Sequence, residues 1–216
     1  MIFENRRQAG AMLGGAICAR EGWQGAVVLA IPRGGVPVGF EVARSLGLPL
    51  DIFVVRKLGA PGQPELAIGA VASGGLVYLN EAVARAFRME RAEFDAAAAR
   101  ELLEIERRET LYRAGRAAID TAGRAVILID DGLATGSTMK AAVAALRPHT
   151  AAIGVAVPVA SRGACHDLSR EADWLVCLET PERFEAVGEF YRDFQETSDD
   201  EVRTLLAEAP ATRPAA

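Results

Sequence analysis

The residues most able to do chemistry stand together between Asp130 and Thr138, in the order Asp-Asp-Gly-Leu-Ala-Thr-Gly-Ser-Thr. A hydrophobic run precedes them and a helix-forming segment follows, so the stretch is predicted to link a buried strand to a helix. In an open parallel sheet, ligands collect at the carboxyl ends of strands, and the N–H groups of a helix N-terminus suit a phosphate. We therefore predict a phosphate-binding loop here.

The two carboxylates that open this stretch need a different ligand, because Asp130 and Asp131 would repel a phosphate. Carboxylates accept hydrogen bonds strongly, and neighbouring sugar hydroxyls are good donors. A phosphate and a diol close together describe ribose 5-phosphate. A helix-capping role for either aspartate is the structural alternative. The residues predicted to hold the phosphate are Gly132, Leu133, Ala134, Thr135, Gly136, Ser137 and Thr138.

Two common nucleotide-binding loops do not fit the same stretch. A Walker A loop needs a lysine directly before its Ser or Thr, and no lysine precedes Ser137 or Thr138. A dinucleotide fingerprint needs G-x-G-x-x-G, which residues 130–138 lack. The stretch is therefore interpreted as a sugar-phosphate site.

An Arg-Gly-Gly sequence follows the first apolar run, residues 26–31. Gly34 and Gly35 can present backbone N–H groups, and Arg33 can pair with phosphate oxygens through two parallel hydrogen bonds. The same residues are also compatible with a plain turn. They are candidates for binding an anionic leaving group.

Arg56 and Lys57 follow the second apolar run, residues 50–55. Two solvated charges at a strand end would explain them equally simply. The stretch from residue 56 to residue 75 is rich in glycine and proline and is predicted as a long loop or ribbon, and segments of this length are often functional.

Apolar runs alternate with helix-forming segments along the chain, which predicts an α/β fold with a largely parallel sheet as its core and flanking helices. Strands are expected at residues 26–31, 50–55, 76–79, 125–129, 151–157 and 174–178, and helices at 6–20, 36–46, 81–116 and 138–146. Residues 1–180 are predicted to form the core domain, residues 181–209 a small aromatic and acidic cap, and residues 210–216 a disordered tail.

Composition restricts the class of protein. The 216 residues carry a net charge of −5, and half of them are hydrophobic, as in ordinary globular domains. This acidity argues against nucleic acid as a partner. No stretch approaches the roughly 18 uncharged apolar residues that cross a bilayer, so no membrane association is expected. Three cysteines without CxxC spacing indicate neither a disulfide framework nor a zinc site, and a cytoplasmic location is expected.

The hydrophobic strand followed by Asp-Asp-Gly-Leu-Ala-Thr-Gly-Ser-Thr is similar to the signature of the type I phosphoribosyltransferases, and the order of elements from residue 26 to residue 178 fits the same family. The resemblance implies a parallel-sheet core with a variable hood, formed here by the C-terminal cap. It implies that 5-phosphoribosyl 1-pyrophosphate (PRPP) binds together with Mg²⁺, with Asp130 and Asp131 on the ribose hydroxyls and residues 134–138 around the 5-phosphate.

The resemblance also assigns roles outside this loop. Arg33, Gly34 and Gly35 would form the pyrophosphate loop, and a mobile lid near residues 56–75 would bring Arg56 and Lys57 to the leaving group. No metal-ligand cluster is evident beyond Asp130 and Asp131, so Mg²⁺ would arrive mainly on the PRPP phosphates. Homodimerisation is an expectation from the resemblance alone.

The expected function is Mg²⁺-dependent transfer of ribose 5-phosphate from PRPP to a nitrogenous base or amine, with release of pyrophosphate, in nucleotide metabolism. The acceptor stays open: members that act on 6-oxopurines carry an acidic residue where this chain has Ala134, and adenine-type enzymes carry a run similar to Ala134-Thr135-Gly136. A PRPP-sensing regulator that contacts RNA or DNA through the arginines of residues 100–116 is the alternative, and a ligand-binding protein without turnover is a third. The charges at Glu104, Arg107 and Arg108 are most simply read as a solvated helix face.

Overall fold

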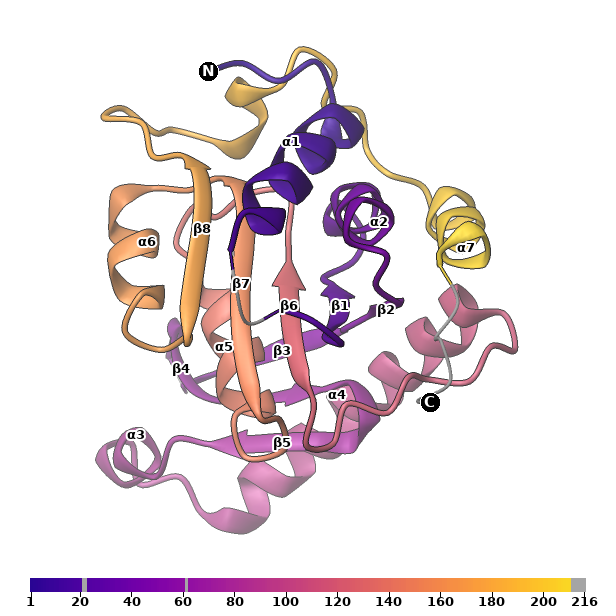
Figure 1. Cartoon of the computed structure of the whole chain (residues 1–216). Coiled ribbons are helices and arrows are strands. Elements are labelled where there is room, and N and C mark those ends of the chain that lie inside the picture. The colour runs from indigo at the N-terminus through magenta and orange to yellow at the C-terminus, as the bar shows by residue number, and fades with distance from the viewer. Residues whose placement is uncertain (21–22, 61, 211–216) are drawn as a thin grey trace.

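A computed structural model describes residues 1–20, 23–60 and 62–210 of the chain, with only the backbone of Pro64 and Glu65. Its centre is a five-stranded parallel sheet with the strand order β2-β1-β6-β7-β8 (Figure 1). The predicted α/β fold with a parallel sheet is confirmed. The strands span Val27–Ala30 (β1), Leu50–Ile52 (β2), Ala125–Ile129 (β6), Ala152–Val159 (β7) and Trp174–Glu179 (β8).

Helices cover both faces of this sheet. They span Arg6–Cys18 (α1), Gly35–Leu46 (α2), Ser137–Leu146 (α5) and Arg162–Leu168 (α6). In β1, Val28 and Ala30 belong to the hydrophobic cluster that contains α1 and α2, whereas Val27 and Leu29 belong to the cluster that contains α5 and α6. Successive side chains of a strand point to opposite faces, so a strand buried on both sides has to be apolar throughout.

The segment predicted as a long loop or ribbon is a ribbon. Residues 55–79 form an antiparallel three-stranded sheet beside the parallel one, so the predicted second strand ends at Ile52 and a new sheet begins at Val55. Ala70 and Ala72 of this ribbon are buried in the same cluster as α5. Pro61 lies outside the described residues, and a lid function for the segment stays a prediction. The ribbon comprises β3 (Val55–Ala60), β4 (Gln63–Ala72), the 3₁₀ turn η1 (Ser73–Gly75) and β5 (Leu76–Leu79).

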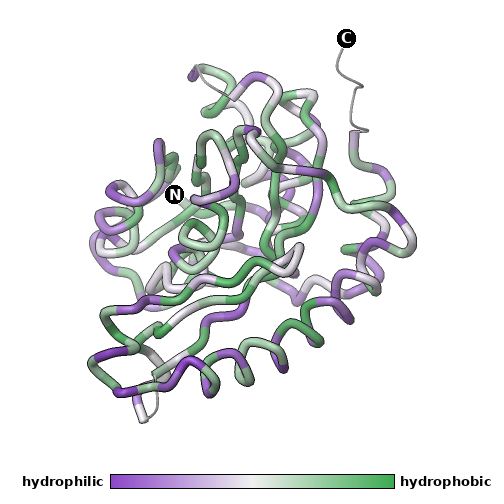
Figure 2. The backbone as a smooth tube through the Cα atoms, turned by 90° about the horizontal axis from the view of Figure 1, so that it is seen from below, coloured by the Kyte–Doolittle hydropathy of each residue, from purple (hydrophilic) through white to green (hydrophobic). Residues whose placement is uncertain are grey.

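The helical segment predicted for residues 81–116 is confirmed as two helices, α3 (Glu81–Ala86) and α4 (Arg91–Arg113). Asn80 caps α3, because its side chain accepts a hydrogen bond from the backbone N–H of Val83 at 3.2 Å. Hydrophobic and hydrophilic residues alternate along the turns of α4 (Figure 2). Its buried residues Phe94 and Ile105 face the core cluster shared with α2 and the ribbon.

The N-terminal residues lie beside the segment around Phe190 at the carboxyl edge of the parallel sheet (Figure 1). The backbone N–H of Phe3 donates to Phe190 O, and that of Arg192 donates to Phe3 O, each at 2.8 Å. The predicted C-terminal cap contains a 3₁₀ turn, η2 (Val187–Phe190), and a helix, α7 (Asp199–Glu208), which packs against α2 and α4. The predicted disordered tail lies outside the described residues from residue 211 onward. Among the described residues, no helix is both long and apolar enough to cross a bilayer.

The packing of α4 gives a direct test of this fold. Phe94→Ala removes a ring that is 1 % exposed, and we expect the free energy of unfolding to fall by about 3–5 kcal/mol. Leu103→Ala on the same helix is the control: its side chain is 68 % exposed, and the expected change is within about 0.5 kcal/mol. Urea unfolding followed by circular dichroism measures both. Equal effects of the two variants would contradict this packing of α4.

Candidate active site

The predicted loops are adjacent because the strands that precede them are neighbours. β1 pairs with β6 in register from Val27↔Val126 to Ala30↔Ile129. The chain leaves β1 toward β2 on one side of this pair and leaves β6 toward β7 on the other. The β1–β6 boundary is therefore the point where the strand order reverses, which is where open α/β sheets bind their ligands.

The Arg-Gly-Gly loop after β1 lies directly against the aspartates after β6. A Cβ atom at Gly34 would overlap Asp131 Oδ2. At Gly35 it would lie 2.8 Å from Ile129 O and 3.0 Å from the Cα atom of Asp130. Only glycine allows this approach, so the glycine pair fits between the two strand ends. The peptide bond between Pro32 and Arg33 is cis.

Asp131 is held by a residue that the sequence did not single out. Arg6, in the first turn of α1, places Nε 2.8 Å from Asp131 Oδ2, and the two side chains are only 11 % and 16 % exposed. The guanidinium also donates through Nη1 to Gln195 O at 2.6 Å and lies 3.9 Å from the centre of the Phe194 ring. The Asp131 carboxylate is therefore already paired within the protein.

Tyr191 supports the same corner from the C-terminal segment. Its hydroxyl donates to the backbone oxygen of Asp131 at 2.6 Å. Burial, and then the nearby Asp131 carboxylate, raise the pKa of Tyr191 far above its ordinary value, so the phenol stays protonated and able to donate. The centre of its ring lies 5.0 Å from that of Phe194, on which it stacks, and 5.5 Å from that of Phe3, so aromatic packing holds the hydroxyl in place.

Asp130 has a different environment from Asp131. Its side chain is partly exposed by surface area but closely surrounded by protein atoms. Burial, and next the charge of Asp131, raise the pKa of Asp130 well above its ordinary value of 3.8, while Arg6 opposes this shift. Asp130 Oδ1 accepts a hydrogen bond from the backbone N–H of Asp131 at 2.8 Å. Asp130 therefore holds a proton more strongly than an ordinary aspartate does.

The predicted phosphate loop is preformed. Gly136 precedes α5 in the left-handed conformation, with φ at 69°, and caps the helix without a side-chain hydrogen bond. Thr135 Oγ1 donates to Ser137 Oγ at 3.1 Å. On the far side, Ser161 Oγ donates to Ala134 O at 2.6 Å and also caps α6. The loop therefore directs the start of α5 outward, with Thr135 and Thr138 exposed.

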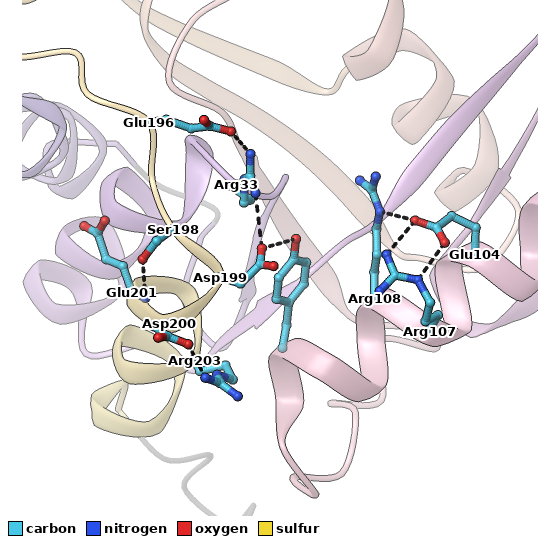
Figure 3. A network of polar contacts seen from close by, with 11 residues as sticks. Arg33, Glu104, Arg107, Arg108, Glu196, Ser198, Asp199, Asp200, Glu201 and Arg203 are labelled. Carbon is cyan, nitrogen blue, oxygen red and sulfur yellow. Dashed lines mark hydrogen bonds and ion pairs between the residues drawn. The ribbon is translucent and has the colours of Figure 1, made fainter.

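The predicted cations occupy three different environments. Arg33 forms ion pairs with Glu196 and, at 3.3 Å, with Asp199 (Figure 3). Arg56 Nε lies 2.9 Å from Glu101 Oε2 of α4. In the ribbon, Arg56 lies opposite Val71 of β4, which is buried on the side of α4. Lys57 lies opposite Ala70, which is buried on the side of α5. Adjacent strand residues point to opposite faces, so this conformation does not bring Arg56 and Lys57 together.

No group of three or more His, Cys, Asp or Glu side chains in the described ranges is arranged to hold a metal ion. Asp130 and Asp131 remain the pair of carboxylates at the β1–β6 boundary. Oxygen ligands of this type suit Mg²⁺, which needs few protein ligands when substrate phosphates share its coordination.

The reversal point of the sheet, the glycine-lined loop after β1 and the loop before α5 define an α/β protein with two loops of ligand-binding type at one edge of its sheet. The family profile described as "Phosphoribosyl transferase domain" matches residues 16–195. The chain belongs to this family, and its fold is that of the type I phosphoribosyltransferases.

Two similar proteins extend this result. The crystal structure of TT1426 from Thermus thermophilus has a TM-score of 0.90 and 42 % identity, and the match covers 98 % of this chain and 100 % of that one. The Mycobacterium tuberculosis protein Rv0571c, provisionally named a phosphoribosyl transferase, is 46 % identical over 209 residues, and the same holds for MT0597 of another strain of that species. The match covers 96 % of this chain and 47 % of these relatives, so the chain spans about half of their length.

The raised proton affinity of Asp130 predicts a pH effect on stability. A carboxyl group with a raised pKa in the folded state contributes stability at low pH that is lost as the pH rises through that pKa. Asp130→Asn keeps the hydrogen-bond acceptor but cannot ionise. Its free energy of unfolding should therefore increase relative to the wild type as the pH rises above 3.8, the ordinary pKa of an aspartate, as measured by urea unfolding. The exposed Asp95, paired with Arg91 on α4, provides the control Asp95→Asn; a parallel pH dependence for both variants would refute the assignment.

Proposed function

We propose that this chain is an Mg²⁺-dependent phosphoribosyltransferase that transfers ribose 5-phosphate from PRPP to a nitrogenous base or amine and releases pyrophosphate. The close packing of the Arg-Gly-Gly loop against the aspartate pair, beside the start of α5, is the observation that carries the proposal. In this proposal, the loops expected to bind the pyrophosphate, the ribose and the 5-phosphate surround one strand boundary. Family membership and the M. tuberculosis relatives support the transferase class.

In this proposal the 5-phosphate binds at the start of α5. The backbone N–H groups of a helix N-terminus carry a partial positive charge, and the hydroxyls of Thr135, Ser137 and Thr138 add donors. Gly132 and Gly136 allow close packing of the loop: a Cβ at Gly136 would lie 3.2 Å from Ala164 of α6. Preformed donors bind phosphate without an ordering cost, which favours this loop as the anchor of the substrate.

The ribose hydroxyls would donate to Asp130 and Asp131. Arg6 does not prevent this, because a carboxylate has two oxygens and about four acceptor positions, and the ion pair uses Oδ2 of Asp131. Arg6 and Tyr191 instead hold Asp131 in a fixed orientation. Mg²⁺, when bound, would neutralise pyrophosphate charge, with Asp130 and Asp131 as its nearest carboxylates and most of its other ligands from PRPP and water.

The leaving pyrophosphate would lie over the loop of Gly34 and Gly35, with Arg33 as its cation. The N–H of Gly35 donates to Ile31 O at 3.1 Å, so Gly34 would supply the backbone donor. Arg33 would then exchange its pairs with Glu196 and Asp199 for phosphate oxygens. Arg56 and Lys57 are proposed to approach when the ribbon moves, as a lid that excludes water from the oxocarbenium-like transition state. Most of the rate would come from positioning and charge stabilisation.

The nucleic-acid alternative receives no support from Arg107, Arg108 or Arg113. Arg113 is 12 % exposed and forms ion pairs with Asp51 at 2.9 Å and Glu109 at 2.7 Å. Arg107 and Arg108 both pair with Glu104. These arginines contact carboxylates of the chain itself rather than forming an open basic face. The acceptor, homodimer formation and a cytoplasmic location stay predictions.

A pyrophosphate-release screen tests the proposal. Purified protein with Mg²⁺ and PRPP is offered a panel of purine and pyrimidine bases and small amines, and turnover with at least one acceptor is expected. The double variant Asp130→Asn plus Asp131→Asn should lower kcat/KM by about 100-fold or more, because two carboxylates that orient the sugar are lost. Asp95→Asn should retain full activity. Binding of PRPP without turnover on any acceptor would instead favour a sensor.

A further inference from the structure

An arginine-lined cavity lies next to the proposed pyrophosphate loop. It measures about 320 Å³, at the lower end of the roughly 300–1,000 Å³ typical of small-molecule sites. Arg33 contributes one wall, and Arg107, Arg108 and Tyr112 of α4 contribute the opposite one. Asp199, at the start of α7, closes the cavity between them (Figure 3). The face of α4 that carries Arg107 and Arg108, which was predicted to be a solvated surface, therefore lines this cavity.

The arginines of α4 are held in place by a carboxylate on their own helix. Glu104 accepts from Nε and Nη2 of Arg107 at 2.8 and 3.0 Å, and from Nε of Arg108 at 2.8 Å. These hydrogen bonds lower the pKa of Glu104 to about 2, so it remains ionised at neutral pH. Arg108 bonds to Glu104 through Nε, and its terminal nitrogens extend past that carboxylate (Figure 3). A guanidinium has five N–H donors, so Arg108 can bind an anion while it stays bonded to Glu104.

Asp199 lies where an oxygen of a bound anion could be held. Its Oδ1 accepts from Arg33 Nη1 at 3.3 Å and from the Tyr112 hydroxyl at 3.1 Å. Tyr112 is 4 % exposed, and burial raises its pKa, so its hydroxyl remains a neutral donor. Arg33 also pairs with Glu196, whose side chain is 77 % exposed. Pairs with exposed carboxylates contribute little stability, so an incoming anion can replace these contacts at small cost.

We propose that this cavity is a distinct binding site for a diphosphate group, gripped between Arg33 on one wall and Arg107 and Arg108 on the other. A two-centre anion can contact both walls at once, and guanidinium groups pair well with phosphate oxygens. In the free protein the carboxylate of Asp199 takes the place of the anion, and its side chain moves out of the cavity when diphosphate binds. The inference rests on the proposed function only through the role of Arg33, because binding of diphosphate requires no turnover.

Inorganic diphosphate is the probe, titrated into the full chain by isothermal calorimetry without acceptor. Arg107→Ala plus Arg108→Ala should weaken its binding about tenfold or more, because charge-assisted hydrogen bonds to the anion are lost. Arg91→Ala is the matched control, since Arg91 lies on the same helix and pairs with Asp95 at 2.8 Å. An unchanged affinity in the double variant, or an equal loss in the control, would overturn the proposal.

For a second variant we expect the opposite effect, a gain in diphosphate affinity. Asp199→Asn removes the competing charge but keeps an oxygen for Tyr112 to donate to, and diphosphate should bind about tenfold more tightly. Asp200→Asn is its control, because Asp200 lies in the same helical turn but pairs with Arg203. Unchanged or weaker binding to the Asp199 variant would show that its contacts are only structural, and would overturn the proposal even if the arginine variant failed to fold.

The same titrations separate this site from the proposed active site. In the variant Asp130→Asn plus Asp131→Asn, diphosphate binding should persist even though PRPP turnover is lost; loss of diphosphate binding there, with normal binding in the α4 double variant, would overturn the proposal. Competition with PRPP tests whether the site is distinct. Diphosphate that binds while PRPP is bound supports a separate site. Displacement of diphosphate by PRPP would show that both use the pyrophosphate subsite of the proposed active site, and would overturn the proposal.

Discussion

The whole site depends on a close approach between the ends of two adjacent strands. Gly34 and Gly35 lie so near Asp130 and Asp131 that a side chain on either glycine would collide with the backbone or carboxylate opposite it. This contact sets the spacing between the loop after β1 and the loop after β6, and therefore the spacing between any pyrophosphate and ribose that bind there. The parallel pairing of β1 with β6 brings the two loops to the same edge, and the glycines allow them to touch.

Segments from both ends of the chain stabilise this contact. Arg6 comes from the first turn of the first helix, and Tyr191 comes from the C-terminal segment; both bind Asp131. The same segment continues to Asp199, which reaches Arg33 and α4. The C-terminal cap therefore contacts both the aspartate after β6 and the arginine after β1.

The parts of the site that depend on local sequence could be predicted. One short stretch contains the apolar run before Asp130, the glycines and hydroxyls after it and the helix that follows. Strand, loop and helix could therefore be predicted from it together. The partners of these residues could not be predicted. Arg6 is 125 positions from Asp131, and Arg33 is 166 positions from Asp199, and no periodicity relates residues that tertiary packing alone brings together. Arg108 looked like surface charge for the same reason.

The most direct test of the central constraint is the affinity of Gly34→Ala for PRPP, measured by calorimetry. Gly163→Ala in α6 is the comparison, because a Cβ atom there meets nothing within 4 Å. With both variants folded by circular dichroism, Gly34→Ala should bind PRPP at least about tenfold more weakly than the wild type, and Gly163→Ala should bind normally. Wild-type affinity in Gly34→Ala would contradict the claim that this contact sets the geometry of the site.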